Sequence, residues 1–284
     1  MKSELIFDAK ATLGEGPAWD AKTQSLYWVD ILEKRIYAGN EILVELDDYV
    51  GCLAPCKNGH LILGSRLSLV DFEPASSKMT TLTSLSSEPL TNRINDGKCD
   101  PKGRFLVGTM DMNEKEASGS LYSFDGKVIT CLLDGIRISN GLAWSPDHKI
   151  FYYIDTSTRK VKAFDYDLAG GQIANQRIAI EVPESLGWPD GMTSDTDGNL
   201  WIAHWHGAQI TRWNPNTGRL LDQVSMPVLQ PSSCVFGGKD MNELYVTSAR
   251  VGMSEADLVR YPLSGGLFKI NTNVIGMRTF EFDG

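Results

Sequence analysis

The sequence predicts an all-β fold, a six-bladed β-propeller with four antiparallel strands in each blade. Three observations lead to this prediction. Short runs of β-forming residues alternate with turn signals along the whole chain, and this pattern recurs with a period near 45 residues. No long amphipathic helix competes with it, because the best helical candidate, residues 254–261, is short and sits inside the last repeat.

The clearest copy of the repeated unit is SNGLAWSPDHKIFYY, residues 139–153. A small polar turn is followed by a short apolar run, a second turn that contains Pro-Asp, and another run rich in β-formers, which is the pattern of a hairpin. Looser copies begin at Gly14 and Pro189. The first residues of the second strands are Leu26, Leu61, Phe105, Ile150, Leu200 and Leu244, at intervals of 35, 44, 45, 50 and 44 residues.

Six such units fill the chain, so we expect residues 1–284 to form a single propeller domain. A β-sandwich or a pair of barrels would also show many short strands, but regular recurrence over the whole length disfavours both. A strand within residues 3–8 should pair with the last unit, because closing the ring in this way leaves no free sheet edge.

Composition narrows the class of partner and the compartment. The formal charge of −9 argues against a nucleic-acid groove, which needs a basic face to meet phosphate. The first apolar run is too short for a secretion signal, and no run has membrane-spanning length. The five cysteines are scattered, so we expect reduced, mostly buried thiols in a cytoplasmic protein. From the charge and the lack of long apolar runs we expect that the protein binds neither nucleic acid nor membrane.

The turn before the first strand of each unit carries the candidate chemistry. The residue before its glycine is Glu15, Val50, Asp96, Asn140 or Asp190 in the first five units, and Ser232-Ser233 takes this place in the sixth. Taken singly, Asn-Gly and Asp-Gly are ordinary turn formers. In a propeller, however, the first strands line the central channel, so these residues should converge on one mouth of it.

A Glu, an Asn and an Asp at equivalent positions would place two carboxylates and an amide oxygen around one axis. Unpaired carboxylates repel each other, so a cation is expected between them. Three oxygen donors without His or Cys suit a hard divalent ion such as Ca²⁺, Mg²⁺ or Mn²⁺, and leave coordination positions open for water or substrate.

Other motifs are weaker. His204-Trp205-His206 would place two rings on one face of a strand end, but no third ligand is in view. Lys98 lies close to the channel mouth, and its spacing favours a charge at a strand edge. The chain has no Gly-x-Ser-x-Gly elbow, phosphate-binding loop or Cys-x-x-Cys pair.

Together these motifs resemble the gluconolactonase/regucalcin (senescence marker protein) family of six-bladed propellers, and within it bacterial sugar lactonases such as xylonolactonases look most similar. The resemblance covers nearly the whole chain in order. It rests on LGEGP at 13–17, RINDG at 93–97, GTM at 108–110, SNG at 139–141, WPDG at 188–191 and CVFGG at 234–238.

The resemblance implies the role of each candidate residue. One divalent metal would be held by Glu15, Asn140 and Asp190, and substrate hydroxyls would be held by Arg93 and Asn95. Some family members add a Glu from the loop after Gly-Thr-Met. That loop contains Glu114 and Glu116 but aligns loosely, so the resemblance does not assign the role to either of them.

The expected function is hydrolysis of a sugar lactone to the aldonic acid. The metal would act as Lewis acid on the lactone carbonyl, and Asp190 would activate water as general base. Ca²⁺ is the expected ion, with Mg²⁺, Mn²⁺, Zn²⁺ and Fe²⁺ as alternatives. The competing functions are a non-enzymatic calcium- or ligand-binding propeller and an enzyme that hydrolyses other esters.

Overall fold

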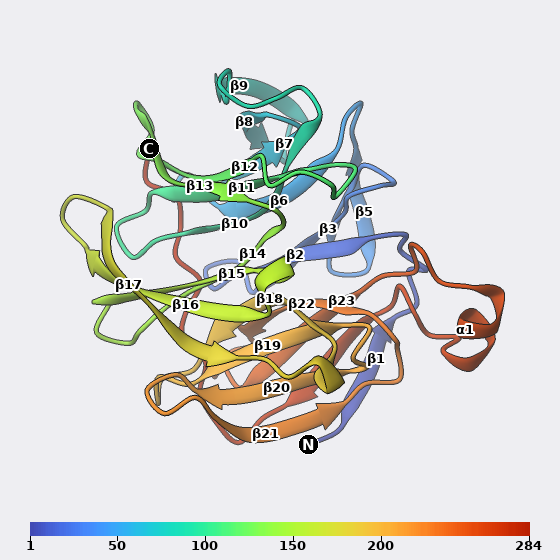
Figure 1. Ribbon diagram of the computed structural model, residues 1–284. Coiled ribbons are helices and arrows are strands. Elements are labelled where there is room, and N and C mark those ends of the chain that lie inside the picture. Colours follow the sequence, from blue (N-terminus) through green and yellow to red (C-terminus); the bar gives the residue numbers. More distant parts are fainter.

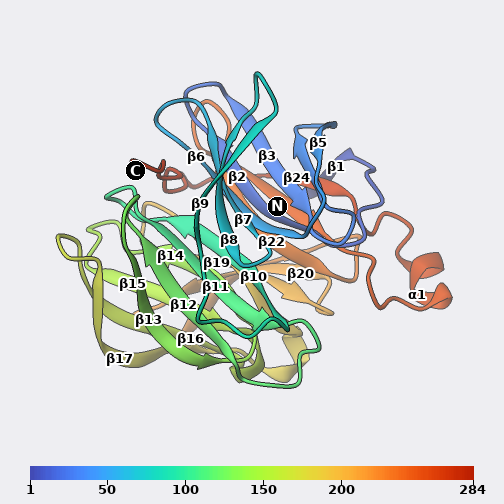
Figure 2. The same cartoon turned by 90° about the horizontal axis from the view of Figure 1, so that it is seen from above.

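A computed structural model describes residues 1–284 and arranges the strands β1 to β24 in six four-stranded antiparallel sheets. The sheets stand around a common centre as the blades of a β-propeller (Figures 1 and 2). This confirms the predicted fold, including the number of blades and the number of strands in each.

The strands follow the chain from the centre of each blade outwards. Blades 1 to 3 contain β2 (Gly14–Asp20), β3 (Ser25–Asp30), β4 (Arg35–Ala38), β5 (Glu41–Glu45), β6 (Val50–Pro55), β7 (Leu61–Ser65), β8 (Ser68–Glu73), β9 (Lys78–Ser84), β10 (Asn92–Cys99), β11 (Phe105–Asp111), β12 (Gly119–Phe124) and β13 (Ile129–Ile136). Blades 4 to 6 contain β14 (Ser139–Trp144), β15 (Ile150–Asp155), β16 (Lys160–Asp167), β17 (Gln172–Glu181), β18 (Trp188–Ser194), β19 (Leu200–Trp205), β20 (Gln209–Asn214), β21 (Arg219–Ser225), β22 (Pro231–Gly237), β23 (Glu243–Ser248), β24 (Leu267–Asn271) and β1 (Ser3–Phe7).

Helical segments are short. Two 3₁₀ turns, η1 (Thr156–Thr158) and η2 (Glu184–Leu186), lie in loops of blades 4 and 5. The helix α1 (Glu255–Arg260) lies within the best helical candidate of the sequence, residues 254–261, and Ser254 caps it by accepting a hydrogen bond from the Asp257 amide. Figure 1 shows α1 projecting from the ring on the connection between β23 and β24. No helix is long and apolar enough to cross a membrane.

The ring closes between the two ends of the chain. β1 pairs antiparallel with β24, with Ser3 opposite Ile270, and becomes the outermost strand of blade 6. The predicted pairing of residues 3–8 with the last unit is therefore confirmed.

Burial decreases from the centre of each blade to its rim. The inner strand β2 is buried at every position, whereas the outer strand β9 is exposed along almost its whole length. Inner strands are enclosed by their own sheet and by neighbouring blades, so the polar residues that they carry, such as Glu15 and Asp190, are buried as well. The five cysteines are free thiols, and all except Cys131 are buried.

Every inner strand carries an irregularity at the same level. The pairing register shifts between Glu15 and Ala18 in blade 1, and the other five inner strands shift at Val50/Cys52, Ile94/Asp96, Asn140/Leu142, Pro189/Met192 and Pro231/Ser233. A bulge bends its strand and redirects the neighbouring side chains. The predicted common turn is thus a common bulge at the entrance of each inner strand.

Blade 3 departs from the predicted register. The unpaired residue of its bulge is Asn95, where blades 2 and 4 have Gly51 and Gly141. Asp96 is the residue after Asn95, and it resumes the regular pairing opposite Gly108. The assignment of Asp96 to the common position was therefore wrong, because asparagine can replace glycine at the bulge.

The other end of the channel is covered by the C-terminal strap, residues 275–284. Backbone amides of Gly276, Met277 and Phe282 donate to carbonyl groups of Met241, Ser194 and Pro55, in blades 6, 5 and 2. The remaining contacts reach the other three blades: Phe280 packs edge-on against Trp144, Asp283 donates its amide to Gly103, and Glu281 pairs with Lys22. One segment thereby touches all six blades.

Candidate metal centre

A cavity of about 610 Å³ opens at the end of the channel where the inner strands begin. Residues from all six blades line it, and they include the five predicted site residues Glu15, Arg93, Asn95, Asn140 and Asp190. The structure therefore brings together residues that are far apart in the sequence. Glu114 also lines the cavity, whereas Glu116 does not.

Glu15 is placed by the bulge of β2. Its side chain is buried, and its carboxylate accepts one hydrogen bond from the Gly16 amide at 2.9 Å. Gly16 has a φ of 53°, which a glycine adopts without strain. Burial raises the pKa of Glu15 to about 8, and the nearby negative charge of Asp96 adds to this rise.

Asn140 is oriented by a hydroxyl group from the next loop. Its Nδ2 donates to Thr156 Oγ1 at 2.8 Å, and Thr156 Oγ1 in turn donates to the Pro189 carbonyl at 2.8 Å. The amide nitrogen is thereby committed to η1. The carbonyl oxygen Oδ1 is then the end of the side chain that is available as a ligand.

Asp190 is the least satisfied polar group of the cavity. Its Oδ1 is buried and has no hydrogen-bond partner. Burial raises the pKa of Asp190 well above its ordinary value, and the charges of Glu15 and Asp96 raise it further. The next residue in the chain is Gly191. A Cβ at this position would lie 2.0 Å from Ser233 Oγ, so the close contact between blades 5 and 6 requires glycine.

These three side chains fit a hard divalent cation. A buried carboxylate oxygen without a partner is costly, and a second carboxylate close enough to raise its pKa makes the cost larger. A cation would remove both penalties. The structure has no cluster of three or more His, Cys, Asp or Glu side chains placed to hold a metal, so a site here depends on the amide oxygen of Asn140, as is usual for ions that prefer oxygen.

Arg93 and Asn95 form a chain of hydrogen bonds that ends at Asn140. Arg93 Nη1 donates to Asn95 Oδ1 at 2.6 Å, and Asn95 Nδ2 donates to Asn140 Oδ1 at 3.0 Å and to the Ser139 carbonyl at 2.8 Å. Burial lowers the pKa of Arg93 to about 10, so the guanidinium stays charged at neutral pH. The pair faces the cavity and also braces the neighbouring blade.

Lys98 is not the strand-edge charge that we expected. It lies in the channel below the mouth, where its Nζ donates to the Met192 carbonyl of blade 5 at 2.8 Å. The negative charge of Asp96 opposes the decrease in its pKa that burial causes. Asp96 and Lys98 are two residues apart on β10, and this spacing on one strand face was the signal that could have placed both in the channel.

The two histidines of His204-Trp205-His206 do not come together. His204 is fully buried, and its Nε2 forms a hydrogen bond with Thr211 Oγ1 at 2.6 Å. β19 ends at Trp205, and His206 has a φ of 57°, so the strand alternation that would align the rings stops before the second ring. His206 instead lines the cavity.

Fold and site together define a class: a six-bladed propeller with a buried oxygen-donor site at one mouth of its channel. A model of the SMP-30/gluconolactonase/LRE-like region matches residues 13–250. The chain belongs to this family, as its motifs indicated.

Similar proteins cover the whole chain. A regucalcin from Gallus gallus is 39% identical over an alignment that spans 100% of this chain and 99% of the relative. Among solved structures, a luciferin-regenerating enzyme superposes with a TM-score of 0.91 at 32% identity and covers 99% of both chains. A calcium-binding regucalcin from Agrobacterium tumefaciens superposes with a TM-score of 0.93 at 26% identity, over 98% of this chain and 96% of the other.

Proposed function

We propose that this protein hydrolyses a sugar lactone to the corresponding aldonic acid with the help of one divalent cation held by Glu15, Asn140 and Asp190. The observation that carries the proposal is the unpartnered, buried Oδ1 of Asp190 in a cavity that Glu15 and Asn140 also line. Membership of a family whose name includes gluconolactonase supports the choice of substrate class. Ca²⁺ is the proposed ion, because oxygen donors favour hard divalent cations and one structural neighbour is described as a calcium-binding protein.

Each side chain has a role in this reaction. A cation in the site would supply Lewis-acid polarisation of the lactone carbonyl. Asp190 takes a proton from the attacking water on its carboxylate, which would be ionised once a cation offsets the burial and the neighbouring charges that raise its pKa in the metal-free protein. Arg93 and Asn95 hold the sugar hydroxyls, and the charge of Arg93 also suits the anionic product.

The second candidate is a calcium-binding propeller without catalytic activity. It is favoured by the printed description of one structural neighbour as a calcium-binding protein and by the regucalcin names of the sequence relatives. A buried pair of carboxylates would serve this function equally well. Hydrolysis of other esters by the same residues is a third candidate.

A lactone panel decides between these functions. Acid release from glucono-, galactono- and xylonolactones, and from simple aryl esters, is followed with Ca²⁺, Mg²⁺, Mn²⁺, Zn²⁺ or Fe²⁺ and after chelation. The expected result is lactone hydrolysis that chelation abolishes and that Glu15→Gln and Asn140→Ala strongly reduce. Calorimetry that detects tight Ca²⁺ binding without turnover of any lactone would favour the binding protein, and turnover of esters alone would favour the third candidate.

A further inference from the structure

The cavity has a distinct wall in blade 5. Trp188 opens β18 two residues before Asp190, and both residues line the cavity. Trp188 as a residue is 37% exposed, although its side chain is large and apolar and lies beside a buried polar site. Trp205 lies opposite Trp188 in the β18–β19 pairing, and the His206 ring stands edge-on to Trp205 with centroids 6.0 Å apart. Trp188, Trp205 and His206 are named the aromatic wall below.

Trp188 is held in a fixed orientation from one side. The guanidinium carbon of Arg159 lies 3.5 Å from the centroid of the indole, which is a close cation–π contact. Arg159 Nη1 also donates to the Gly187 carbonyl at 2.7 Å, so the arginine is tied to the backbone just before the tryptophan. Because Arg159 covers one face of the ring, the exposed area belongs to the other face and the edges.

The rest of the cavity differs from this wall in chemistry. Arg93 and Asn95 of blade 3 and Asn140 of blade 4 present charged and amide groups to the same space. A ligand that fits both sides needs polar groups on one side and a C–H surface on the other. A hydroxylated lactone ring has these two sides, because its hydroxyls project from the ring while its C–H bonds form an apolar face.

We propose that Trp188 is a stacking platform that packs against the C–H face of the lactone ring, and that Arg159 is a positioning residue that holds the indole in place. The substrate class is then a polyhydroxylated cyclic lactone with one face free of hydroxyl groups, placed between the aromatic wall and Arg93. This inference rests on the proposed function and specifies which lactones the site accepts.

The kinetic test uses the metal-loaded protein and glucono-, galactono- and xylonolactone. Trp188→Ala should raise KM about tenfold with little change in kcat, since stacking is lost but the reacting groups remain. Trp188→Phe should stay within about threefold of the wild-type KM. Arg159→Gln should raise KM less than Trp188→Ala does. Ile178→Ala, at an exposed apolar position on the outer strand β17, is the matched control and should leave both constants unchanged.

A second measurement does not depend on turnover. D-glucose, a pyranose that has the same ring C–H face but no ester to hydrolyse, is titrated while indole emission is followed, and its binding is measured separately by calorimetry. The wild-type emission should change on binding, and the change should largely disappear in Trp188→Phe although glucose still binds.

The outcomes separate the two proposals. A wild-type protein that hydrolyses none of the lactones overturns the proposed function, and the glucose titration then still tests the contact with Trp188. Active wild type with an unaltered KM in Trp188→Ala, or an equal change in emission in Trp188→Phe, overturns the stacking platform alone.

Discussion

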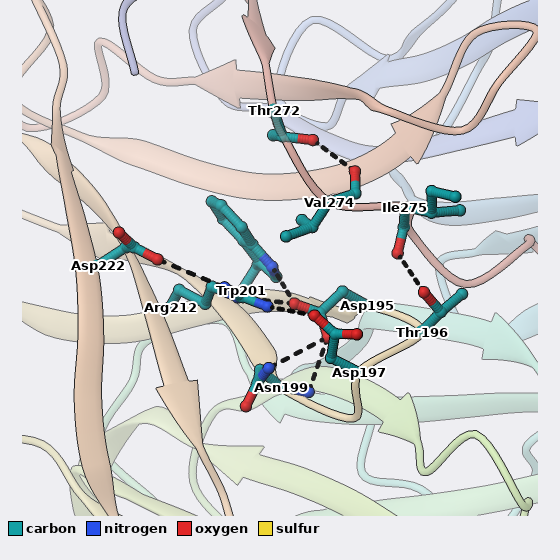
Figure 3. Close-up of polar contacts among 10 residues, drawn as sticks. All are labelled: Asp195, Thr196, Asp197, Asn199, Trp201, Arg212, Asp222, Thr272, Val274 and Ile275. Carbon is teal, nitrogen blue, oxygen red and sulfur yellow. Dashed lines mark hydrogen bonds and ion pairs between the residues drawn. The ribbon is translucent and has the colours of Figure 1, made fainter.

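Two buried aspartates only five residues apart in blade 5, Asp190 and Asp195, have opposite surroundings. Oδ1 of Asp190 has no partner. The carboxylate of Asp195, which is fully buried, accepts hydrogen bonds from Trp201 Nε1 at 3.0 Å, from Arg212 Nε at 2.7 Å and from the Asn199 amide at 2.9 Å (Figure 3).

The difference separates a structural carboxylate from a functional one. Asp195 ties the turn after β18 to Arg212 on β20 within the blade, so its charge is fully used by the protein. Asp190 lies at the opposite end of β18, where the protein leaves Oδ1 without a partner and available to a ligand. Burial alone does not distinguish the two groups, whereas the number of donors around each does.

The largest expected effect is loss of activity on removing the Asp190 charge. Asp190→Asn should lower kcat/KM for the lactone by about 10³-fold, because the general base and a negative charge that attracts the cation are both lost. The metal-free variant should be at least as stable as the wild type, since a buried carboxyl group with an unpartnered oxygen has been removed. Lactone assays and urea unfolding of the variant and the wild type check both expectations. A variant less stable than the wild type would show that Asp190 is a structural carboxylate like Asp195.

Asp195→Asn should show the reverse behaviour. Arg212 would lose its buried partner but keep Asp197 and Asp222, so the free energy of unfolding should fall by about 3 kcal/mol. The kcat of the folded protein should not change. Urea denaturation monitored by circular dichroism measures the first quantity and steady-state kinetics the second, and an undiminished unfolding free energy would contradict the comparison.

The orientation of Asn140 gives a smaller effect. Thr156→Val removes the hydroxyl group that fixes the Asn140 amide, and Ca²⁺ affinity should fall about ten- to a hundredfold, as is common when a group behind a metal ligand is lost. Thr156→Ser keeps the hydroxyl and should bind like the wild type. Calorimetry on both variants checks this, and equal affinities would show that Thr156 does not position the ligand.

The smallest effect is on pH-dependent stability. In metal-free protein the pKa of Glu15 is raised from 4.5 to about 8, so folded protein holds a proton that the unfolded chain has released between these values. Stability should therefore be fully present at low pH and fall as pH rises through this window. Chelated wild type should lose several degrees in Tm between pH 5 and pH 8, Glu15→Gln should lose less, and saturating Ca²⁺ should diminish the loss. If the Tm of chelated wild type and that of Glu15→Gln fell equally between pH 5 and pH 8, this account would be refuted.

Much of the architecture could be predicted because it depends on repetition. Each unit repeats the same turn, so the number of blades, the closure by β1 and the convergence of Glu15, Asn140 and Asp190 all followed from one recurring pattern. The register of blade 3 was missed because Asn95 replaces the glycine that marked the other bulges. The interval of eight residues from Gly97 to Phe105, shorter than in the other units, was the sign of that shift.

Contacts between blades could not be predicted in the same way. Thr156 reaches the Pro189 carbonyl, and Arg159 reaches Trp188, from a neighbouring blade. Such pairs depend on how two sheets face each other, and the spacing within one unit carries no information about it. The pairing of Asp195 with Arg212 was equally hidden, because many acidic and basic residues along the chain have a comparable separation.

The C-terminal strap has a consequence for how the protein is made. Ser3 must wait for Ile270 before it can pair, and the strap follows still later. On the ribosome, an almost complete set of blades is therefore translated before the first strand finds its neighbour and the far opening of the channel is covered. Such long-range pairing slows folding, so blade 6 should be completed only after residues 267–284 have left the exit tunnel.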